Sequence, residues 1–238
     1  MHLNRRQTMN ETTKLRADFA SRVVVTPEDY AWEASPTPGV DRIKLDRIGN
    51  EIARATSIVK YAANQSFPAH RHDGGEEILV LDGTFIDEDG VYPAGTYLRN
   101  PAGTTHRPAA GPDGALLFVK LHQFQNQDQE TVRVQTRSGH WRPGLVDGLT
   151  VLPLHQYETE HVALVHWAPD TQFSRHTHFG GEEIFVIEGT FHDEHGSYPK
   201  GSWIRSPHLS KHTPFTESDG ALIYVKTGHL SDENQPAP

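Results

Sequence analysis

The sequence lacks cysteine and has no long apolar run. Its 238 residues contain no cysteine, which excludes disulfide bonds and thiolate metal ligands. No stretch approaches the roughly 18 consecutive apolar residues that indicate a membrane-spanning helix. Integral membrane proteins built from helices are therefore excluded, and any metal ion would have to be bound through nitrogen and oxygen atoms.

Positive charge is also scarce. The chain has 22 lysines and arginines against 31 aspartates and glutamates, for a formal net charge of -9. Such a balance repels phosphate backbones, and no stripe of basic residues overrides it. The first 20 residues contain no apolar segment typical of secretion. We therefore expect a protein of the cytoplasm that binds neither nucleic acid nor membranes.

No part of the sequence keeps a helical period over several turns. The hydrophobic fraction is 35%, while 20 glycines and 16 prolines provide many turn residues. The apolar runs are short, as in EILVLDGTF and ALLFVKL, and turn segments such as DEDG and GPDG separate them. This pattern predicts an all-β protein of the jelly-roll barrel type, with another kind of β-sandwich as the alternative.

Two copies of one sequence unit make up most of the chain. When the sequence is compared with itself at an offset of 106 residues, residues 61–120 align with residues 167–226. Between His70 and His106, 20 of the 37 positions are identical in the two copies. Internal repetition at this level indicates two domains of the same architecture.

The repeat sets the predicted domain boundaries. We predict an N-terminal domain of residues 17–126 and a C-terminal domain of residues 137–230, joined by a polar linker, 127–136, that has room for one strand. Both ends of the chain are polar and unpatterned. We expect residues 1–16 to form a disordered or extended arm and residues 231–238 to form a flexible tail.

Each copy contains the spacing His-x-His-x-x-x-Glu and a further histidine 34 residues after the second one. The two sets are His70, His72, Glu76 and His106, and His176, His178, Glu182 and His212. Residues two apart in a strand project from one face, so a single strand supplies two imidazoles. Neutral imidazole and carboxylate together suit divalent iron, zinc, nickel or manganese. We predict one divalent metal ion in each domain.

The ligand sets have alternative interpretations. The four residues could be ordinary surface or core residues, and the second set could be a vestigial site kept for packing. Because Glu77 follows Glu76, and Glu183 follows Glu182, the ligand within each pair is ambiguous. The spacing to a later glycine favours the first glutamate of each pair. Strand alternation then directs the second glutamate outward, as an ion-pairing or interface residue.

These motifs resemble a known family. The first cupin motif is matched by His70, His72, Glu76 and Gly83, and the second is matched by Gly95, Pro101, Gly103 and His106. The segments DGTFIDEDGVYPAGTY and EGTFHDEHGSYPKGSW are similar to the cupin-like domain of ChrR-type anti-sigma factors and their stand-alone relatives, acetylacetone-cleaving-dioxygenase-like cupins. The resemblance covers nearly all of both units and implies two tandem cupin domains, a bicupin.

The resemblance implies metal chemistry on a small molecule. Cupin sites of this composition commonly support dioxygen chemistry, so our first hypothesis is a metal-dependent dioxygenase for a small enolisable carbonyl compound, such as a β-diketone. Glu76 and Glu182 are the candidate catalytic residues, as proton acceptors. The alternatives are a non-catalytic zinc- or small-ligand-binding module with a regulatory role, and an isomerase or hydrolase. ChrR-type regulators hold the sigma factor with a zinc-binding domain for which this chain has no cysteines, which disfavours an anti-sigma role.

The second unit departs from the first at one motif position and in its histidines. Leu209 replaces Gly103, so we expect the loop to be rebuilt there and the second site to be less regular. Five histidines of the second unit have no histidine counterpart in the first, and we expect most of them at the surface. They are His161, His166, His192, His195 and His208.

Two further pairs of residues recur at matched positions. Arg99 and Arg205 could bind an anionic substrate, or could pair within the framework with Asp87 and Asp193, which we weigh as the better reading. Tyr97 and Trp203 could line a cavity mouth, although packing within the wall is the simpler interpretation. Exposed strand edges also lead us to expect association into a homodimer.

Overall fold

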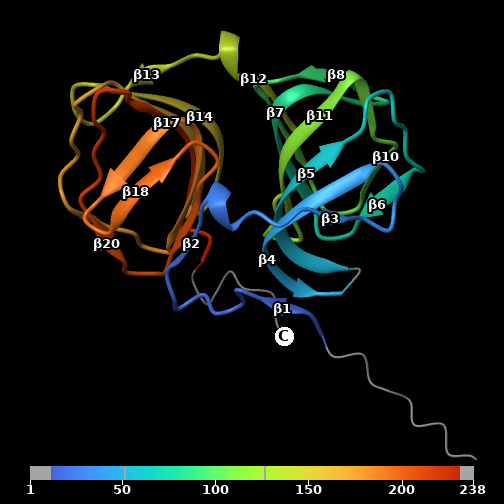
Figure 1. The fold of residues 1–238 in the computed structure, drawn as a ribbon, viewed down its shortest axis with the longest axis horizontal. Helices are drawn as coiled ribbons and strands as arrows, with labels where there is room; N and C mark the ends of the chain where they lie inside the picture. The colour runs from blue at the N-terminus through green and yellow to red at the C-terminus, as the bar shows by residue number, and fades with distance from the viewer. Residues whose placement is uncertain (1–11, 51, 126, 231–238) are drawn as a thin grey trace, which may run out of the picture.

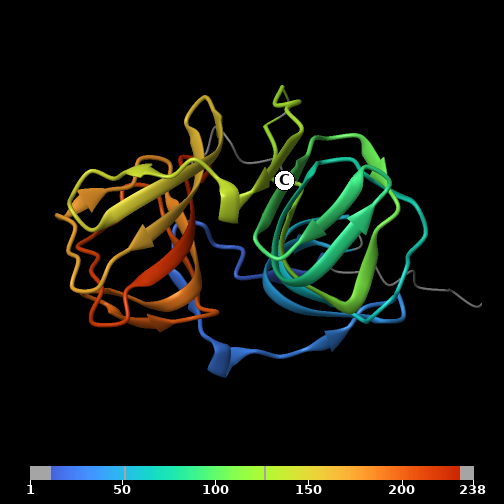
Figure 2. The same cartoon turned by 90° about the horizontal axis from the view of Figure 1, so that it is seen from above.

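The computed structural model describes residues 12–50, 52–125 and 127–230, which form two β-barrels side by side (Figures 1 and 2). The described ranges contain no α-helix, and their helical segments are two 3-10 turns, η1 (Pro27–Asp29) and η2 (Thr136–Ser138). The predicted all-β fold with two jelly-roll barrels is therefore confirmed. None of these residues belongs to a helix long and apolar enough to cross a membrane.

The N-terminal barrel is closed by a large sheet and a two-stranded sheet. The large sheet has nine strands, with the order β1-β4-β5-β11-β7-β9-β12 and with β3 and β8 added on β4 and β7. The two-stranded sheet consists of β6 and β10. The bounds are β1 (Lys14–Leu15), β3 (Glu33–Ala34), β4 (Val40–Gly49), β5 (Ala53–Tyr61), β6 (His70–His72), β7 (Glu76–Asp87), β8 (Gly90–Pro93), β9 (Thr96–Asn100), β10 (Thr104–His106), β11 (Ala109–Leu121) and β12 (Val132–Gln135).

The C-terminal barrel repeats this plan. Its large sheet has eight strands, with the order β13-β14-β15-β21-β17-β19-β2 and with β18 added on β17, and β16 and β20 form the small sheet. The bounds are β2 (Val23–Val25), β13 (Arg142–Pro143), β14 (Leu149–Tyr157), β15 (Glu160–Trp167), β16 (His176–Thr177), β17 (Glu182–Asp193), β18 (Gly196–Pro199), β19 (Trp203–Ser206), β20 (Lys211–His212) and β21 (Ala221–Thr227).

The two barrels exchange one strand each. Strand β2 comes from the N-terminal part of the chain but pairs with β19 of the C-terminal barrel, where it is the blue strand beside the orange ones in Figure 1. Strand β12 follows the first repeat, in the segment predicted as a linker, and pairs with β9 of the N-terminal barrel. Each barrel is thus completed by a strand that lies outside its own repeat.

Part of the predicted N-terminal arm is ordered. Residues 1–11 and the predicted tail, residues 231–238, lie outside the described residues. Strand β1 falls within the predicted arm and pairs with the end of β4, with Lys14 opposite Ile48 and Leu15 opposite Arg47. The chain then runs as an extended segment across to the C-terminal barrel, where β2 begins.

The large sheets bury both of their faces. Along β7, Ile78 and Val80 contribute to the core inside the N-terminal barrel, whereas Leu79 between them belongs to a core shared by both barrels. In the shared core the ring of Phe118 stacks on Phe185 of the other barrel at a centroid distance of 4.7 Å. Burial on both faces explains why these strands read as continuous apolar runs instead of alternating ones.

Candidate metal centres

The short strands β6 and β10 bring the N-terminal histidines together. Their antiparallel register sets His106 directly opposite His70, and His72 lies two residues farther along β6 on the same face. Glu76 is the first residue of β7 and reaches the group after the Gly74–Gly75 turn. The three strands therefore converge as the sequence spacing predicts.

The ligand atoms of this group face one another. His72 Nε2 lies 3.0 Å from His106 Nε2, and Glu76 Oε2 lies 3.4 Å and 3.5 Å from these two nitrogens. The ring of His70 meets both other rings edge-on, with centroid distances of 4.7 Å and 5.0 Å. Ligating atoms of the three histidines lie within 4.8 Å of one another, and Glu76 approaches from one side of this cluster.

The C-terminal group is arranged in the same way. His176 lies opposite His212 in the pairing of β16 with β20, and His178 Nε2 lies 3.0 Å from His176 Nε2. Glu182 Oε2 lies 3.5 Å from His178 Nε2 and 3.6 Å from His212 Nε2. Here all four residues offer ligating atoms within 4.8 Å of one another, so the C-terminal group is the more compact of the two.

The chemistry of these groups fits a divalent metal ion. Two imidazole nitrogens that each lie about 2.1 Å from one ion are about 3.0 Å apart when they meet at a right angle, which is the separation of the facing Nε2 atoms. Glu182 is buried, and its Oε2 atom has no hydrogen-bond partner. A cation among the imidazoles would satisfy this oxygen, which otherwise bears an uncompensated desolvation penalty.

Outer contacts orient the imidazoles with Nε2 toward the centre. In the first histidine of each pair, Nδ1 lies near the carbonyl oxygen two residues earlier, at 3.2 Å for His70 and 3.0 Å for His176. His212 Nδ1 lies 3.3 Å from Asp193 Oδ2, and His106 Nδ1 lies 3.7 Å from Asp87 Oδ2. Carboxylates and carbonyls in these positions fix the tautomer of metal-binding histidines.

Burial keeps the second histidine of each motif in its neutral form. Burial lowers the pKa of His72, and it lowers the pKa of His178 to about 3, with further contributions from His212 and His176. A neutral imidazole is the form that binds a metal ion. At neutral pH both histidines are therefore prepared for metal binding.

The expectation of a rebuilt loop at Leu209 is wrong. Leu209 adopts the same left-handed backbone region as Gly103, with φ of 64° against 89°. Its amide donates to His178 O over 2.9 Å, just as the Gly103 amide donates to His72 O over 2.8 Å. The loop keeps its path because this hydrogen bond and the adjacent β20 hold it. The strain falls on the leucine itself and leaves the second site as regular as the first.

The second glutamate of each pair lies between the barrels, as predicted. Glu77 is buried and binds Lys226 Nζ of the C-terminal barrel at 2.9 Å and Arg99 Nη1 at 3.2 Å. Glu183 in turn binds Lys120 Nζ of the N-terminal barrel at 2.7 Å. The geometry therefore assigns Glu76 and Glu182 to the histidine groups and their neighbours to the interface.

The matched arginines belong to the framework but have other partners than predicted. Arg99 binds Glu77, Asp128 and Glu160, while Arg205 Nη1 donates to Asp46 Oδ2 over 2.8 Å. Both guanidinium groups are fully buried, so a substrate-binding role is wrong. The pairing with Asp87 and Asp193 is also wrong, because those carboxylates face His106 and His212.

Tyr97 and Trp203 do not line a cavity mouth. Both are fully buried in the core shared by the barrels, and the Trp203 indole donates to Glu183 Oε1 over 3.1 Å. Packing within the wall, the simpler interpretation, is thereby confirmed. Their matched positions mark the two sides of the barrel interface.

A third group of possible metal ligands lies in this interface. Asp128, His155 and Glu160 are buried with their ligating atoms within 4.8 Å. Arg99 contacts Asp128 and Glu160, however, and Lys226 Nζ lies 3.0 Å from Glu160 Oε1. These two cations already balance the carboxylates, so we assign the group to the interface and not to metal binding.

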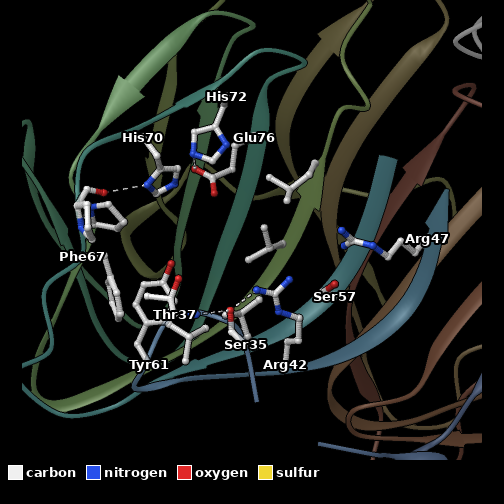
Figure 3. Close-up of a pocket in the computed structure, with 16 residues that line it drawn as sticks. Ser35, Thr37, Arg42, Arg47, Ser57, Tyr61, Phe67, His70, His72 and Glu76 are labelled. Carbon is white, nitrogen blue, oxygen red and sulfur yellow. Dashed lines mark hydrogen bonds and ion pairs between the residues drawn. The ribbon is translucent and has the colours of Figure 1, made fainter. Parts of the chain in front are cut away.

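The N-terminal histidine group lines a cavity of about 340 Å³ inside its barrel. Figure 3 shows His70, His72 and Glu76 on one side of this space, with Tyr61 and Arg42 across from them. Ser35, Thr37, Arg47 and Ser57 add further polar groups to the lining. Our sequence reasoning missed these residues. Comparison of the two copies around β4 would have identified Arg42, which has no arginine counterpart.

The C-terminal group lines a smaller and more apolar cavity, of about 170 Å³. Valine, leucine, isoleucine, phenylalanine and tryptophan side chains form most of its wall. A second, wider depression of about 680 Å³ also includes His176, His178 and Glu182, together with the exposed His161 and His208. His166 and His195 are exposed as well, and His192 alone of the five extra histidines is buried against Phe215. The prediction that most of them lie at the surface is confirmed.

Comparisons with known proteins agree with this description. The family model of the ChrR cupin-like domain matches residues 20–125 and 129–231. No curated protein matches the chain. The chain is similar to the structure of a candidate dioxygenase from Nostoc punctiforme, with a TM-score of 0.72, 14% identity, and coverage of 92% of this chain and 85% of that one.

Two further solved structures share the architecture. A candidate glyoxylate-induced protein from Pseudomonas aeruginosa has a TM-score of 0.70 and 15% identity, with 93% of this chain and 94% of that chain covered. An oxalate decarboxylase variant from Bacillus subtilis has a TM-score of 0.63 and 11% identity, with 87% and 77% covered. At such identities the likeness concerns the fold of two tandem barrels.

Proposed function

The chain belongs to the ChrR cupin-like domain family, and from this premise we propose that it is a metal-dependent dioxygenase for a small enolisable carbonyl compound. One observation carries the proposal. Three histidines and Glu76 converge at the side of an enclosed cavity of about 340 Å³, which has room for a small molecule beside them. The similarity to a candidate dioxygenase supports the proposed reaction by analogy of fold.

His70, His72, Glu76 and His106 would hold the metal ion. A redox-active ion such as iron, bound through these groups, supplies Lewis acidity and the capacity to react with dioxygen. Asn100 Nδ2 donates to Glu76 Oε2 over 3.2 Å, which orients the carboxylate within the group. Glu76 is also the residue positioned to accept a proton from an enolisable substrate.

Tyr61 supplies a second proton-handling group in the same cavity. Burial raises the pKa of its phenol, and the negative charge of Glu76 raises it further. The phenol therefore stays protonated at neutral pH and can donate a hydrogen bond to a carbonyl or enolate oxygen of the substrate. The apolar side chains Val59, Phe67 and Val119 exclude water from the remaining wall.

The C-terminal site favours a second candidate function. Its cavity of about 170 Å³ is lined mainly by apolar side chains, although its four ligands are compact. We propose that this site binds its metal ion, zinc for instance, without turnover and serves a structural or regulatory purpose. In that case Glu182 is a ligand only, whereas Glu76 retains the catalytic role.

The proposed function is tested by measuring oxygen uptake. Iron-loaded protein is incubated with a series of β-diketones, and we expect one O₂ to be consumed for each molecule of diketone cleaved. The His72→Ala variant should lose this activity, whereas His178→Ala, altered at the matched position of the C-terminal site, should retain it. If no diketone disappears with matched uptake, or if His178→Ala is the inactive variant, the proposal is wrong.

A further inference from the structure

Arg42 is the cation of the N-terminal cavity, and its environment is unusual for this chain. It lies on β4 opposite Val59 of β5, and both residues line the cavity. Figure 3 shows its guanidinium group beside Ser35, across the cavity from His70 and His72. A charged group at this place faces the space that a substrate would fill.

No carboxylate of the described residues pairs with Arg42. Its Nη2 donates to the hydroxyl of Ser35, and its buried Nε atom has no hydrogen-bond partner. The buried Arg54, Arg99 and Arg205 all have carboxylate oxygens within 3.5 Å. Because a buried donor without a partner is costly, the exception indicates that the missing anion comes from a ligand.

The nearby Arg47 is held differently. It also lines the cavity, but its Nε donates to the carbonyl of Gly49 over 3.1 Å and its Nη2 to the carbonyl of Asn50. These hydrogen bonds direct part of its guanidinium group toward the end of the β4–β5 hairpin. Arg47 therefore adds positive potential to the cavity, whereas Arg42 offers the open donor.

The C-terminal barrel shows that the fold does not require an arginine here. The strand registers are equivalent, since Arg42 lies opposite Val59 as Val151 lies opposite Val165. Val151 thus occupies the place of Arg42, and Trp167 occupies that of Tyr61, opposite Leu149 as Tyr61 is opposite Val40. A barrel with the same ligand set closes with an apolar wall at this point, so the charge of Arg42 serves the cavity and not the barrel.

We propose that the N-terminal cavity binds substrates that carry a carboxylate, and that Arg42 holds this carboxylate while the opposite end of the molecule faces the histidine group. A guanidinium group offers paired donors that match the two oxygens of a carboxylate. Ser35 already orients Arg42, so part of the ordering entropy has been lost before binding. This inference deepens the proposed function, on which it rests only for the metal end of the cavity.

A matched pair of ligands tests this selectivity. Acetoacetate and acetoacetamide have nearly the same shape and differ in charge, and their binding to the zinc-loaded protein is measured by calorimetry, without redox turnover. We expect acetoacetate to bind more tightly. Arg42→Val, which introduces the residue found at position 151, should weaken acetoacetate binding by about 10- to 100-fold, as expected for a hydrogen-bonded charge pair. Its affinity for acetoacetamide should change less than about twofold, and Arg42→Lys should retain part of the selectivity.

The control is Arg142→Val, which removes an exposed arginine of β13 in the other barrel and should leave both affinities unchanged. Thermal unfolding of each variant verifies that the fold is intact. Equal weakening of both ligands, unchanged acetoacetate binding, or no detectable binding of acetoacetate to the wild type would overturn the proposal. If charge selectivity holds while the iron-loaded protein consumes no oxygen, the dioxygenase proposal fails and this inference stands.

Discussion

At the scale of single residues, the ligand sets could be read from the sequence because their spacing is local. His70 and His72 share one face of a strand, and each glycine pair permits the turn that returns Glu76 or Glu182 to the group. Arg42 could not be recognised in this way. The copies align at an offset of 106 residues at Tyr61 and Trp167 but of 109 at Val40 and Leu149, so a three-residue difference hides the exchange of Arg42 for Val151.

Metal stoichiometry tests the two ligand sets independently. The wild-type chain should retain two divalent ions, and His72→Ala and His178→Ala should each retain one, because loss of one of four ligands also releases the orientation of the others. Elemental analysis after dialysis measures the ratio of metal to chain. Two ions bound to either variant would show that the substituted histidine is not a ligand.

Backbone strain at Leu209 can be measured by exchanging the residues of the two copies. A leucine in the left-handed region costs about 1–2 kcal/mol, whereas glycine costs about 0.5–1 kcal/mol in unfolded-state entropy. Since the Leu209 side chain is 52% exposed, it gains little from packing. Leu209→Gly should therefore raise the free energy of unfolding by about 0.5 kcal/mol.

The reverse exchange provides the control. Gly103→Leu should lower the free energy of unfolding by about 1–2 kcal/mol. A Cβ atom at Gly103 would meet only the flexible end of Arg71, at 3.3 Å, so the loss would come from the backbone and not from a clash. Urea denaturation measures both variants. A Gly103→Leu protein as stable as the wild type would contradict the presence of strain.

At the scale of elements, the exchanged strands were the part of the fold that the sequence concealed. The segments VVV at 23–25 and VRV at 132–134 both have strand-forming composition. Nothing within them tells which barrel they join, because that choice depends on where the edges of β9 and β19 lie in space. The sequence therefore predicted strands of the right kind in the right number of barrels, without their partners.

Strand β2 should be essential to the stability of the barrel that it completes. Val25 is 1% exposed, lies opposite Trp203, and packs in the core shared by the barrels. Val25→Asp would bury a carboxylate without a partner, and we expect a loss of about 3 kcal/mol or more in the free energy of unfolding. Denaturant unfolding monitored by tryptophan fluorescence measures this loss.

The matched control lies on β8, an outer strand of the N-terminal barrel. Val91 is 65% exposed, so Val91→Asp should change the free energy of unfolding by less than about 0.5 kcal/mol. If Val25→Asp were as mild as Val91→Asp, the pairing of β2 with β19 would not contribute to the folded state in solution.

At the scale of the whole molecule, a layer of buried charges joins the barrels. Glu77, Lys120, Glu183 and Lys226 are 2% exposed or less, and each ion pair described above connects residues from different repeats. Such pairs add little net stability over apolar contacts, but removal of one partner leaves a costly unpaired charge. The layer therefore specifies one relative placement of the barrels.

His229 makes the stability of this layer dependent on pH. Burial lowers its pKa to about 4, although Glu183 opposes the shift. As pH falls from about 6.5 to 4, the unfolded chain takes up a proton that the folded protein does not. Stability present above pH 6.5 is therefore lost progressively, by up to about 3 kcal/mol at pH 4. His229→Gln, which can still donate to Glu183, should remove this part of the pH dependence.

The measurement is the free energy of unfolding of both proteins between pH 4 and 7. The two curves should differ in slope over that range, and His195→Gln, altered at an exposed histidine, should follow the wild type. Parallel curves for the wild type and His229→Gln would contradict the lowered pKa. Association into a homodimer stays a prediction, and the same samples allow it to be measured by sedimentation.

The exchange of β2 and β12 also changes what counts as one half of this molecule. If the chain were cut between the repeats, at residues 127–131, the first piece would carry the strand that closes the second barrel, and the second piece would carry the strand that closes the first. The pieces could complete each other only by crossing over, as two copies do in a swapped dimer. The intact chain performs this crossing within one molecule, where the tether keeps each lent strand at a high local concentration.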